Sequence, residues 1–184
     1  VVVPEVAVIS RPGAASRLEE AQLMAPVLAR YRPLVRIDAP GTLDGGDILQ
    51  VEQRVFIGVS DRTNEAGARQ LQAILTPLGY SCHLIPVAAG LHLKSSLNYI
   101  GKNTLLVTQD FAQYPAVHGF STIISPQEEE YAANTLLINN TLLMPEGYPK
   151  TYALVQALGL PIQILDTSEF RKMDGGLSCL SLRL

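Results

Sequence analysis

The sequence predicts an α/β fold, and two observations carry this prediction. Strand-length apolar runs alternate with amphipathic helical segments, and the order strand, strand, helix, strand recurs along the chain. The recurrence has a period of roughly 40 to 45 residues, which is typical of one supersecondary unit repeated about an axis. A doubly wound three-layer sheet also suits alternating strands and helices, but the phosphate-binding patterns GxGxxG and GxxxxGK[ST] do not occur.

Hydrophobic periodicity gives the expected elements. Strands are expected over residues 6–9, 34–37, 43–52, 55–59, 83–87, 105–107, 122–124, 135–138, 142–144 and 162–165. Helices are expected over residues 16–31, 63–78 and 149–158. Ser16 with Glu19 has the form of a capping box at the start of the first helix. Residues 93–124 are expected to form a more degenerate copy of the unit.

Composition and charge exclude several classes of protein. A chain of 184 residues, 47% of them hydrophobic, is expected to form a single globular domain over residues 1–184. The net charge is -3 and no Lys/Arg run occurs, which argues against nucleic acid or an anionic membrane as partner. The apolar runs are too short to span a bilayer. Two cysteines, with no secretory signal pattern at the start, fit a reducing cytoplasm.

Asp44 and Asp47 flank Gly45 and Gly46 just where a predicted strand begins. A glycine pair permits a positive φ and the close approach of another group, so both carboxylates could project into a cavity. The same composition suits an ordinary β-turn, and spacing alone favours the turn.

A histidine and a cysteine stand in two further segments. His92 lies between two leucines, and its imidazole can both give and take a proton near neutral pH. A histidine in an apolar setting is, however, more often a core residue. Cys179 follows the pair Gly175 and Gly176, and an ordered turn there can supply the thiolate character that catalysis needs, although an isolated cysteine is usually a small buried side chain. Cys82 lacks glycine neighbours and is expected to be structural.

Taken together in this order, the segments resemble the guanidine-modifying, or pentein, superfamily, and most closely the dimethylarginine dimethylaminohydrolases. The matching segments are residues 11–17, 42–47, 60–64, 90–95 and the stretch around Cys179. Several motifs in a fixed order are more specific than any one of them, and they outweigh the structural alternatives. The resemblance implies a pentein-type α/β propeller of ββαβ modules around a pseudo-fivefold axis, incomplete here, with about three and a half modules in this chain.

The resemblance also implies a cysteine hydrolase that acts on guanidinium groups. Cys179 matches the nucleophile, His92 the general acid/base, and Asp44 the carboxylate that steers the histidine and the guanidinium. Methylated arginine would be hydrolysed to citrulline and a methylamine through a covalent thiouronium on Cys179. Arginine deiminase or amidinotransferase chemistry is a close variant, and a non-catalytic arginine-binding module is the alternative of a different class.

Other residues are implied to hold the substrate, a small guanidino amino acid. Arg17 and Arg62 match positions that bind its α-carboxylate, and the backbone around Met173 matches the segment that binds its α-amino group. Asp47 is expected to join Asp44 at the guanidinium edge. No metal or organic cofactor is expected, and a homodimer is one open assembly. Relatives carry a preceding module that nothing here aligns with, so we expect further sequence before Val1 in the native polypeptide.

Overall fold

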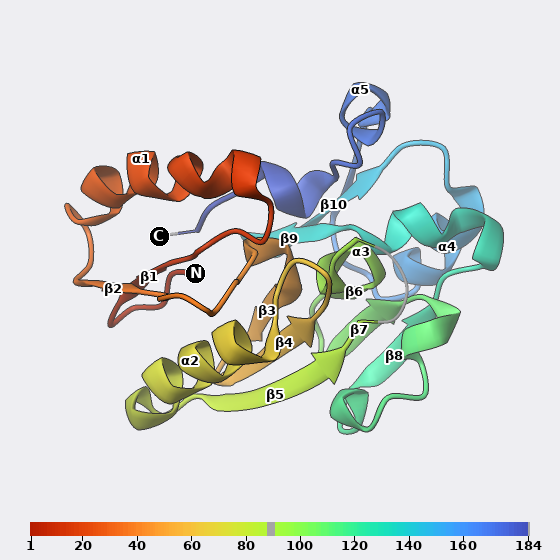
Figure 1. Ribbon diagram of the computed structural model, residues 1–184. Helices are drawn as coiled ribbons and strands as arrows, with labels where there is room; N and C mark the ends of the chain where they lie inside the picture. Colours follow the sequence, from red (N-terminus) through yellow and green to blue (C-terminus); the bar gives the residue numbers. More distant parts are fainter. Residues whose placement is uncertain (88–90, 184) are drawn as a thin grey trace. The chain divides into compact units, whose positions relative to one another are not determined.

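The computed structural model describes residues 1–87 and 91–183 and has an α/β architecture (Figure 1). The chain divides into two compact units, one of Val1–Leu93 with the C-terminal residues from Leu182, the other of Lys94–Ser181. Gly90, which belongs to the histidine-bearing segment, lies outside the described residues.

Short strands and helices alternate along both units. The strands are β1 (Ala7–Ile9), β2 (Leu34–Arg36), β3 (Ile48–Val51), β4 (Arg54–Val59), β5 (Ser81–Pro86), β6 (Leu97–Tyr99), β7 (Thr104–Val107), β8 (Ser121–Ile124), β9 (Leu136–Ile138), β10 (Thr141–Pro145) and β11 (Ile162–Leu165). The α-helices are α1 (Leu18–Leu28), α2 (Glu65–Leu75), α3 (Leu93–Ser96), α4 (Pro149–Gln156) and α5 (Ser168–Arg171). Each predicted strand and helix is found, with bounds shifted by a few residues at most of the ends. The strand expected from residue 43 begins only at Ile48, because Gly45–Asp47 forms a 3-10 turn, and β6, α3 and α5 were not predicted.

The sheets repeat one topology. In each of the sheets β3-β4-β5, β6-β7-β8 and β9-β10-β11, the first pair of strands is antiparallel and the second pair is parallel. Strands β1 and β2 form a parallel pair, and an antiparallel bridge joins Val2 to Ala7. The predicted ββαβ repeat is therefore confirmed. The copy that contains β6, β7 and β8 is degenerate as expected, because two 3-10 turns, Gln109–Phe111 and Pro115–Val117, replace the crossover helix between β7 and β8.

In the first unit, helix α2 packs on the sheet β3-β4-β5 (Figure 1). Its buried face consists of Ala68, Leu71 and Leu75, which share a core cluster with Val55 and Ile57 of β4. The side chain of Asn64 caps the helix by accepting a hydrogen bond from the Gly67 N–H at 2.8 Å, a cap that contributes about 1 kcal/mol. A Cβ on Gly67 would lie 2.0 Å from the carbonyl oxygen of Thr42. The start of α2 is thus pressed against the backbone that leads into the Asp44–Asp47 turn.

The start of helix α1 differs from the prediction. Ala15–Arg17 forms a 3-10 turn, and the N-cap of α1 is Arg17, which makes no side-chain capping bond. The predicted capping box of Ser16 and Glu19 is therefore wrong, because Ser16 already lies inside the turn and cannot be the residue that precedes the helix. The helix also ends at Leu28, three residues before its predicted end.

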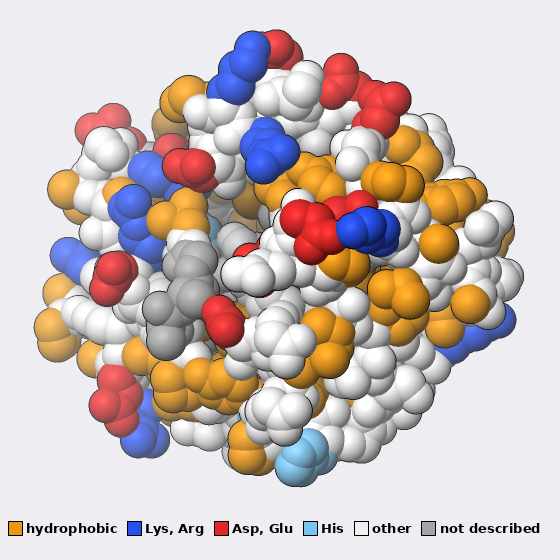
Figure 2. Space-filling model, turned by 90° about the vertical axis from the view of Figure 1, so that its right-hand side faces the viewer, with side chains coloured by type: hydrophobic (Ala, Val, Ile, Leu, Met, Phe, Trp, Pro, Cys, Tyr) orange, Lys and Arg blue, Asp and Glu red, His pale blue; other side chains and the backbone are white. Residues whose placement is uncertain are grey.

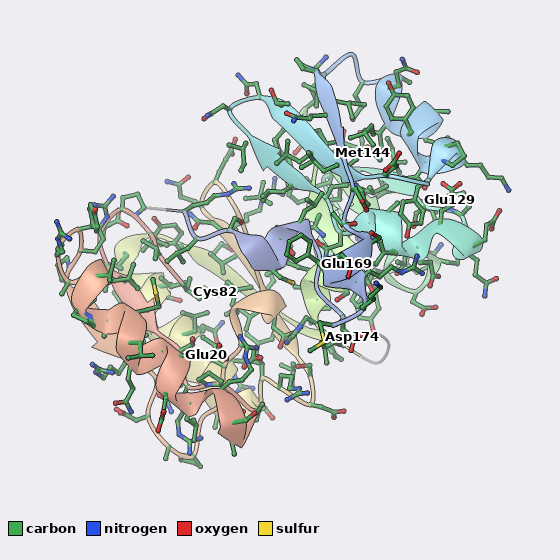
Figure 3. The ribbon with its side chains drawn as sticks, turned by 90° about the horizontal axis from the view of Figure 1, so that it is seen from above. Glu20, Cys82, Glu129, Met144, Glu169 and Asp174 are labelled. Carbon is green, nitrogen blue, oxygen red and sulfur yellow. The ribbon has the colours of Figure 1, made fainter. Side chains whose placement is uncertain are left out.

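In the second unit, helix α4 begins against a buried carboxylate. Glu129, labelled in Figure 3, is 6% exposed and accepts hydrogen bonds from the N–H groups of Lys150 at 3.1 Å and Thr151 at 2.6 Å. The Thr151 hydroxyl donates a third bond at 2.7 Å. Burial by itself raises the pKa of Glu129, but the bonds from Thr151 and Lys150 and the charge of Lys150 hold that pKa below its usual value. The carboxylate thus satisfies N–H groups that a helix start leaves without partners.

None of the described helices is long and apolar enough to cross a membrane. On the face drawn in Figure 2, acidic and basic side chains are interspersed among hydrophobic ones, so the described part of this face carries no basic stripe.

Glu129→Gln is expected to lower the free energy of unfolding at pH 7 by about 1 to 3 kcal/mol, because glutamine keeps the shape but loses the charge that strengthens these hydrogen bonds. The pKa of Glu129 is lowered by folding, so its contribution is complete above the unfolded pKa and disappears as pH falls through the lower folded value. The difference between parent and variant should therefore shrink in acid. Urea titrations across pH measure it, with the exposed Glu128→Gln as a control that should change little. Coincident curves for Glu129→Gln and the parent would contradict this role.

Candidate active site

The segment Asp44 to Asp47 forms a tight turn that buries both carboxylates. Gly45–Asp47 is a single 3-10 turn, closed by a hydrogen bond from the Asp47 N–H to the Asp44 carbonyl at 3.0 Å. Asp44 is 4% exposed and Asp47 is 0% exposed. The turn favoured by composition is confirmed, and it directs both acidic side chains into the protein.

Three residues in two distant segments donate hydrogen bonds to Asp44. Its Oδ1 accepts a hydrogen bond from the Gly13 N–H at 3.0 Å, and its Oδ2 lies 3.3 Å from Arg17 Nη1 and 3.2 Å from His92 Nε2. Burial by itself raises the pKa of Asp44. The hydrogen bonds from His92 and Gly13, together with the positive charge of Arg17, outweigh that effect and hold the pKa below its usual value. Asp44 is therefore ionised at neutral pH.

An ionised Asp44 determines which nitrogen of His92 carries the proton. A carboxylate can only accept hydrogen bonds, so Nε2 donates to Asp44 Oδ2. Nδ1 is then the ring nitrogen that can exchange a proton with a reacting group. The His92 side chain is 12% exposed, so most of the ring is held inside the protein.

One glycine of the turn is required by this histidine. A Cβ on Gly46 would lie 2.6 Å from His92 Cγ and 2.8 Å from its Nδ1, closer than real Cβ atoms come. A Cβ on Gly45 would meet no atom within 4 Å. The imidazole therefore packs directly against the Gly46 backbone, a distinction that the sequence, with two adjacent glycines, does not contain.

Asp47 holds the backbone beside the histidine. Its Oδ1 accepts a hydrogen bond from the Leu93 N–H at 2.9 Å, and its Oδ2 accepts from the hydroxyls of Ser60 at 2.8 Å and Thr63 at 2.6 Å. Protein donors thus surround a carboxylate for which the sequence analysis expected a substrate contact. That contact stays a prediction, while the observed bonds favour a supporting role.

The segments that bear the two arginines meet at Gly13. A Cβ on Gly13 would lie 2.4 Å from the carbonyl oxygen of Arg62, and the Gly13 N–H binds Asp44. Arg17 is about half-exposed and pairs with Asp44 through Nη1 and with Glu20 through Nε and Nη2, at 2.9 to 3.3 Å. Figure 3 labels Glu20 on α1. Glu20 was not among the predicted site residues, although its spacing of three residues from Arg17 in the predicted helix is a sequence signal for such a pair.

Cys179 and Met173 belong to the second unit. Cys179 is exposed and lies in the 3-10 turn Leu177–Leu180, where its N–H donates to the Gly176 carbonyl at 3.0 Å. Met173 is 85% exposed. Cys82 of the first unit is half-buried, and burial raises the pKa of its thiol. Its surroundings agree with the structural role expected for it.

Among residues 1–87 and 91–183, no group of three or more His, Cys, Asp or Glu side chains is arranged to hold a metal ion. The groups that the described residues offer are an ionised carboxylate, an imidazole with one ring nitrogen available for proton exchange, and an exposed thiol. These are the groups of nucleophilic and acid/base catalysis.

Gly46→Ala should displace the His92 ring and break its contact with Asp44, whereas Gly45→Ala should leave both in place. Forcing a methyl group into a packed site typically costs about 1 to 3 kcal/mol, so we expect that loss of unfolding free energy for Gly46→Ala and less than about 1 kcal/mol for Gly45→Ala. Urea unfolding measures the stabilities, and NMR of the His92 ring nitrogens reports the contact with Asp44. Equal stabilities with unchanged ring signals in both variants would show that Gly46 is not needed for the histidine.

Comparison with known proteins gives strong likenesses among curated proteins and solved structures. No family model matches the chain. The N(G),N(G)-dimethylarginine dimethylaminohydrolase of Pseudomonas aeruginosa is 44% identical over 179 residues, which are 96% of this chain and 70% of the relative. The protein of the same name from Streptomyces coelicolor is 38% identical over 185 residues, 100% of this chain and 71% of the relative.

The solved structures agree. A structure of the Pseudomonas aeruginosa enzyme, a cysteine-to-serine variant complexed with citrulline, matches with a TM-score of 0.97 and 42% identity, covering 100% of this chain and 73% of that one. The N-terminal domain of a cyanobacterial arginine dihydrolase matches with a TM-score of 0.87 over 100% of this chain and 72% of that one, and at 17% identity it supports the fold alone. The predicted pentein-type fold is confirmed by these likenesses, and at this identity and coverage the chain belongs to the dimethylarginine dimethylaminohydrolase family.

Proposed function

We propose that this chain hydrolyses Nω-methylated arginine to citrulline and methylamine or dimethylamine. Membership of the family indicates a hydrolase that acts on C–N bonds of guanidino groups, and a related enzyme has been solved with citrulline bound. The observation that carries the proposal is the Asp44–His92 pair, 3.2 Å between Oδ2 and Nε2, formed by two of the motifs that define the resemblance.

The first half of the reaction forms a covalent intermediate. The guanidinium carbon is a poor electrophile because its charge is delocalised over three nitrogens, so a strong nucleophile is needed. The thiolate of Cys179 attacks this carbon, and the C–N bond to the methylated nitrogen breaks. His92 gives the proton on Nδ1 to that nitrogen, which leaves as a neutral amine, and a thiouronium remains on the cysteine sulfur.

The second half releases citrulline. Neutral His92 takes a proton from water, and the resulting hydroxide equivalent attacks the same carbon. The C–S bond breaks, the thiolate of Cys179 is restored, the histidine is again protonated, and the remaining hydroxyl proton passes to solvent, where the released amine can take it up. Asp44 stays ionised and accepts a hydrogen bond from the Nε2–H group throughout, which keeps Nδ1 available.

Arg17 and Arg62 bind the α-carboxylate of the substrate, since guanidinium binds carboxylates through paired hydrogen bonds, and the backbone around Met173 binds its α-amino group. The pairing of Arg17 with Glu20 and Asp44 means that a substrate carboxylate shares this guanidinium with protein carboxylates. Asp47 supports the turn that carries Asp44, and its own contact with the guanidinium edge is the less favoured part of the proposal because its side chain is buried.

Both units belong to one catalytic domain in this proposal. The enzyme acts in the cytoplasm, where its two free cysteines stay reduced, and a homodimer stays one open assembly. Sedimentation velocity of the full-length protein measures the assembly.

The proposal predicts which cysteine reacts and which product leaves. In the full-length protein, Cys179→Ser should lose turnover of dimethylarginine, whereas Cys82→Ser should stay within about twofold of the parent because burial raises the pKa of that thiol. 2-Chloroacetamidine, an amidine electrophile, should label Cys179 in peptide mapping. Amine analysis separates the alternatives, since an arginine deiminase releases ammonia from arginine and an arginine-binding module releases nothing. Label on Cys82 alone, or faster release of ammonia from arginine, would refute the assignment.

His92 must be protonated when the amine leaves and neutral when water attacks, and this gives a second prediction. His92→Gly should still allow Cys179 to attack S-methyl-L-thiocitrulline, whose leaving group needs little help, but should stall hydrolysis of the thiouronium. We expect an adduct on Cys179 by mass spectrometry and a loss of about two to four orders of magnitude in turnover of dimethylarginine, the usual contribution of a positioned acid/base. A histidine-to-glycine variant of a related enzyme has been solved as an adduct with this compound.

The exposed His118→Gly is the matched control and should turn over at the parent rate. Parent-like turnover by His92→Gly would make His92 a packing residue and end the three-residue mechanism.

A further inference from the structure

The turn that carries Cys179 lacks a cap of its own. Its N-cap residue is Gly176, which has no side chain to accept a hydrogen bond from the N–H groups at the start of the turn. The first backbone hydrogen bond of the turn runs from the Cys179 N–H to the Gly176 carbonyl. The Ser178 N–H lies before this bond, so it needs an acceptor from outside the turn.

Asn134 supplies that partner from 44 residues earlier in the chain. Its Oδ1 accepts a hydrogen bond from the Ser178 N–H at 3.1 Å, and both residues are 6% exposed. A Cβ on Gly176 would lie 2.2 Å from Asn134 Nδ2 and 2.5 Å from its Cγ. The side-chain amide therefore packs against the Gly176 backbone, and only glycine at position 176 admits it.

A second contact holds the same segment on the other side of the glycine. The hydroxyl of Tyr131 donates to the Gly175 carbonyl at 2.8 Å, and the guanidinium of Arg171 lies 4.9 Å from the centre of the Tyr131 ring. Hydrogen bonds with Asn134 and Tyr131 thus fix the backbone at Ser178 and at Gly175, respectively. The labels of Glu169 and Asp174 in Figure 3 mark the stretch just before this segment.

Tyr131 and Asn134 are themselves held in place by neighbouring hydrogen bonds. Tyr131 lies in the 3-10 segment Gln127–Ala133, and the Asn134 N–H donates to the Tyr131 carbonyl at 3.1 Å. The Ala133 carbonyl accepts a bond from Asn98 Nδ2 at 2.8 Å, and Glu129 ties the segment to α4. A side chain that acts from such a support can hold its partner within a few tenths of an ångström.

We propose that Asn134 is a positioning residue for the thiol of Cys179. The inference rests on the proposed function, in which Cys179 is the nucleophile. Asn134 acts through the backbone of Ser178, one residue before the cysteine, and sets where the sulfur stands when the guanidinium carbon is presented. Because misplacing a reacting group by about 1 Å can cost a hundredfold in rate, its loss should slow the chemical step more than it weakens substrate binding.

Asn134→Leu in the full-length protein removes the acceptor and keeps the size. We expect kcat for dimethylarginine to fall about ten- to hundredfold with KM within about threefold of the parent, while the exposed Cys179 still reacts with iodoacetamide at about the parent rate. Hydrogen exchange of the Ser178 N–H should accelerate at least about tenfold, since its acceptor is gone. Asn134→Asp keeps an acceptor oxygen and should restore the exchange protection and part of kcat.

Thr135→Val is the matched control, because Thr135 is adjacent and 1% exposed, and its hydroxyl has no hydrogen-bond partner among the described residues. It should leave kcat and exchange unchanged. If the leucine variant does not fold, Asn134→Ala is measured in the same way. Parent-like kcat in the leucine or alanine variant, or a KM that rises in proportion to the loss, overturns the inference alone. A parent or a Cys179→Ser variant that contradicts the predicted turnover overturns the proposed function, and with it any catalytic role for Asn134.

Discussion

The first unit is organised by the need to bury two carboxylates within one turn. Asp44 and Asp47 are almost fully buried, and a buried negative charge is costly unless donors surround it. The donors come from segments far apart in the sequence: Gly13 and Arg17 near the start, Ser60 and Thr63 after β4, and His92 with Leu93 beyond β5. Each bond that stabilises a carboxylate therefore also fixes a segment that carries a proposed catalytic or binding residue. The same contacts therefore stabilise the first unit and set the geometry of its proposed site residues.

In the second unit, too, buried side-chain oxygens accept hydrogen bonds from backbone N–H groups. Glu129 accepts hydrogen bonds from N–H groups at the start of α4, and Asn134 accepts one from the N–H of Ser178, the residue before Cys179. The proposed catalytic residues lie in or beside short elements: Asp44 precedes one 3-10 turn, Cys179 lies in another, and His92 directly precedes the four-residue helix α3. In each unit a buried side-chain oxygen accepts a hydrogen bond from the backbone N–H next to a proposed catalytic residue: that of Leu93, after His92, and that of Ser178, before Cys179. A backbone N–H held in this way fixes the direction of the side chain without occupying the side chain itself.

Much of this could be predicted from the sequence, and what could not depends on long-range contacts. The strands other than β6, the three longer helices and the repeated ββαβ order follow from local periodicity, and the motifs pointed to Asp44 and His92. The capping box at Ser16 failed because its pattern does not reveal that a 3-10 turn precedes α1. Asn134 and Glu129 carried no signal, because their importance lies in partners 44 and 22 residues away. Nor could periodicity show that the Asp47 carboxylate turns toward protein donors.

The proton chemistry follows from the unequal use of the two imidazole nitrogens. Asp44 is held ionised by a lowered pKa, so it does not remove the proton from Nε2 but receives a hydrogen bond from it. In the proposed reaction Nε2 is therefore occupied in both halves, and every proton transfer passes through Nδ1. That nitrogen lies beside the bare backbone of Gly46, where a side chain would take up the space that the ring occupies. The glycine pair thus has two separate purposes: Gly45 completes the turn, and Gly46 lets the ring lie where Nε2 meets the carboxylate and Nδ1 is left for the substrate.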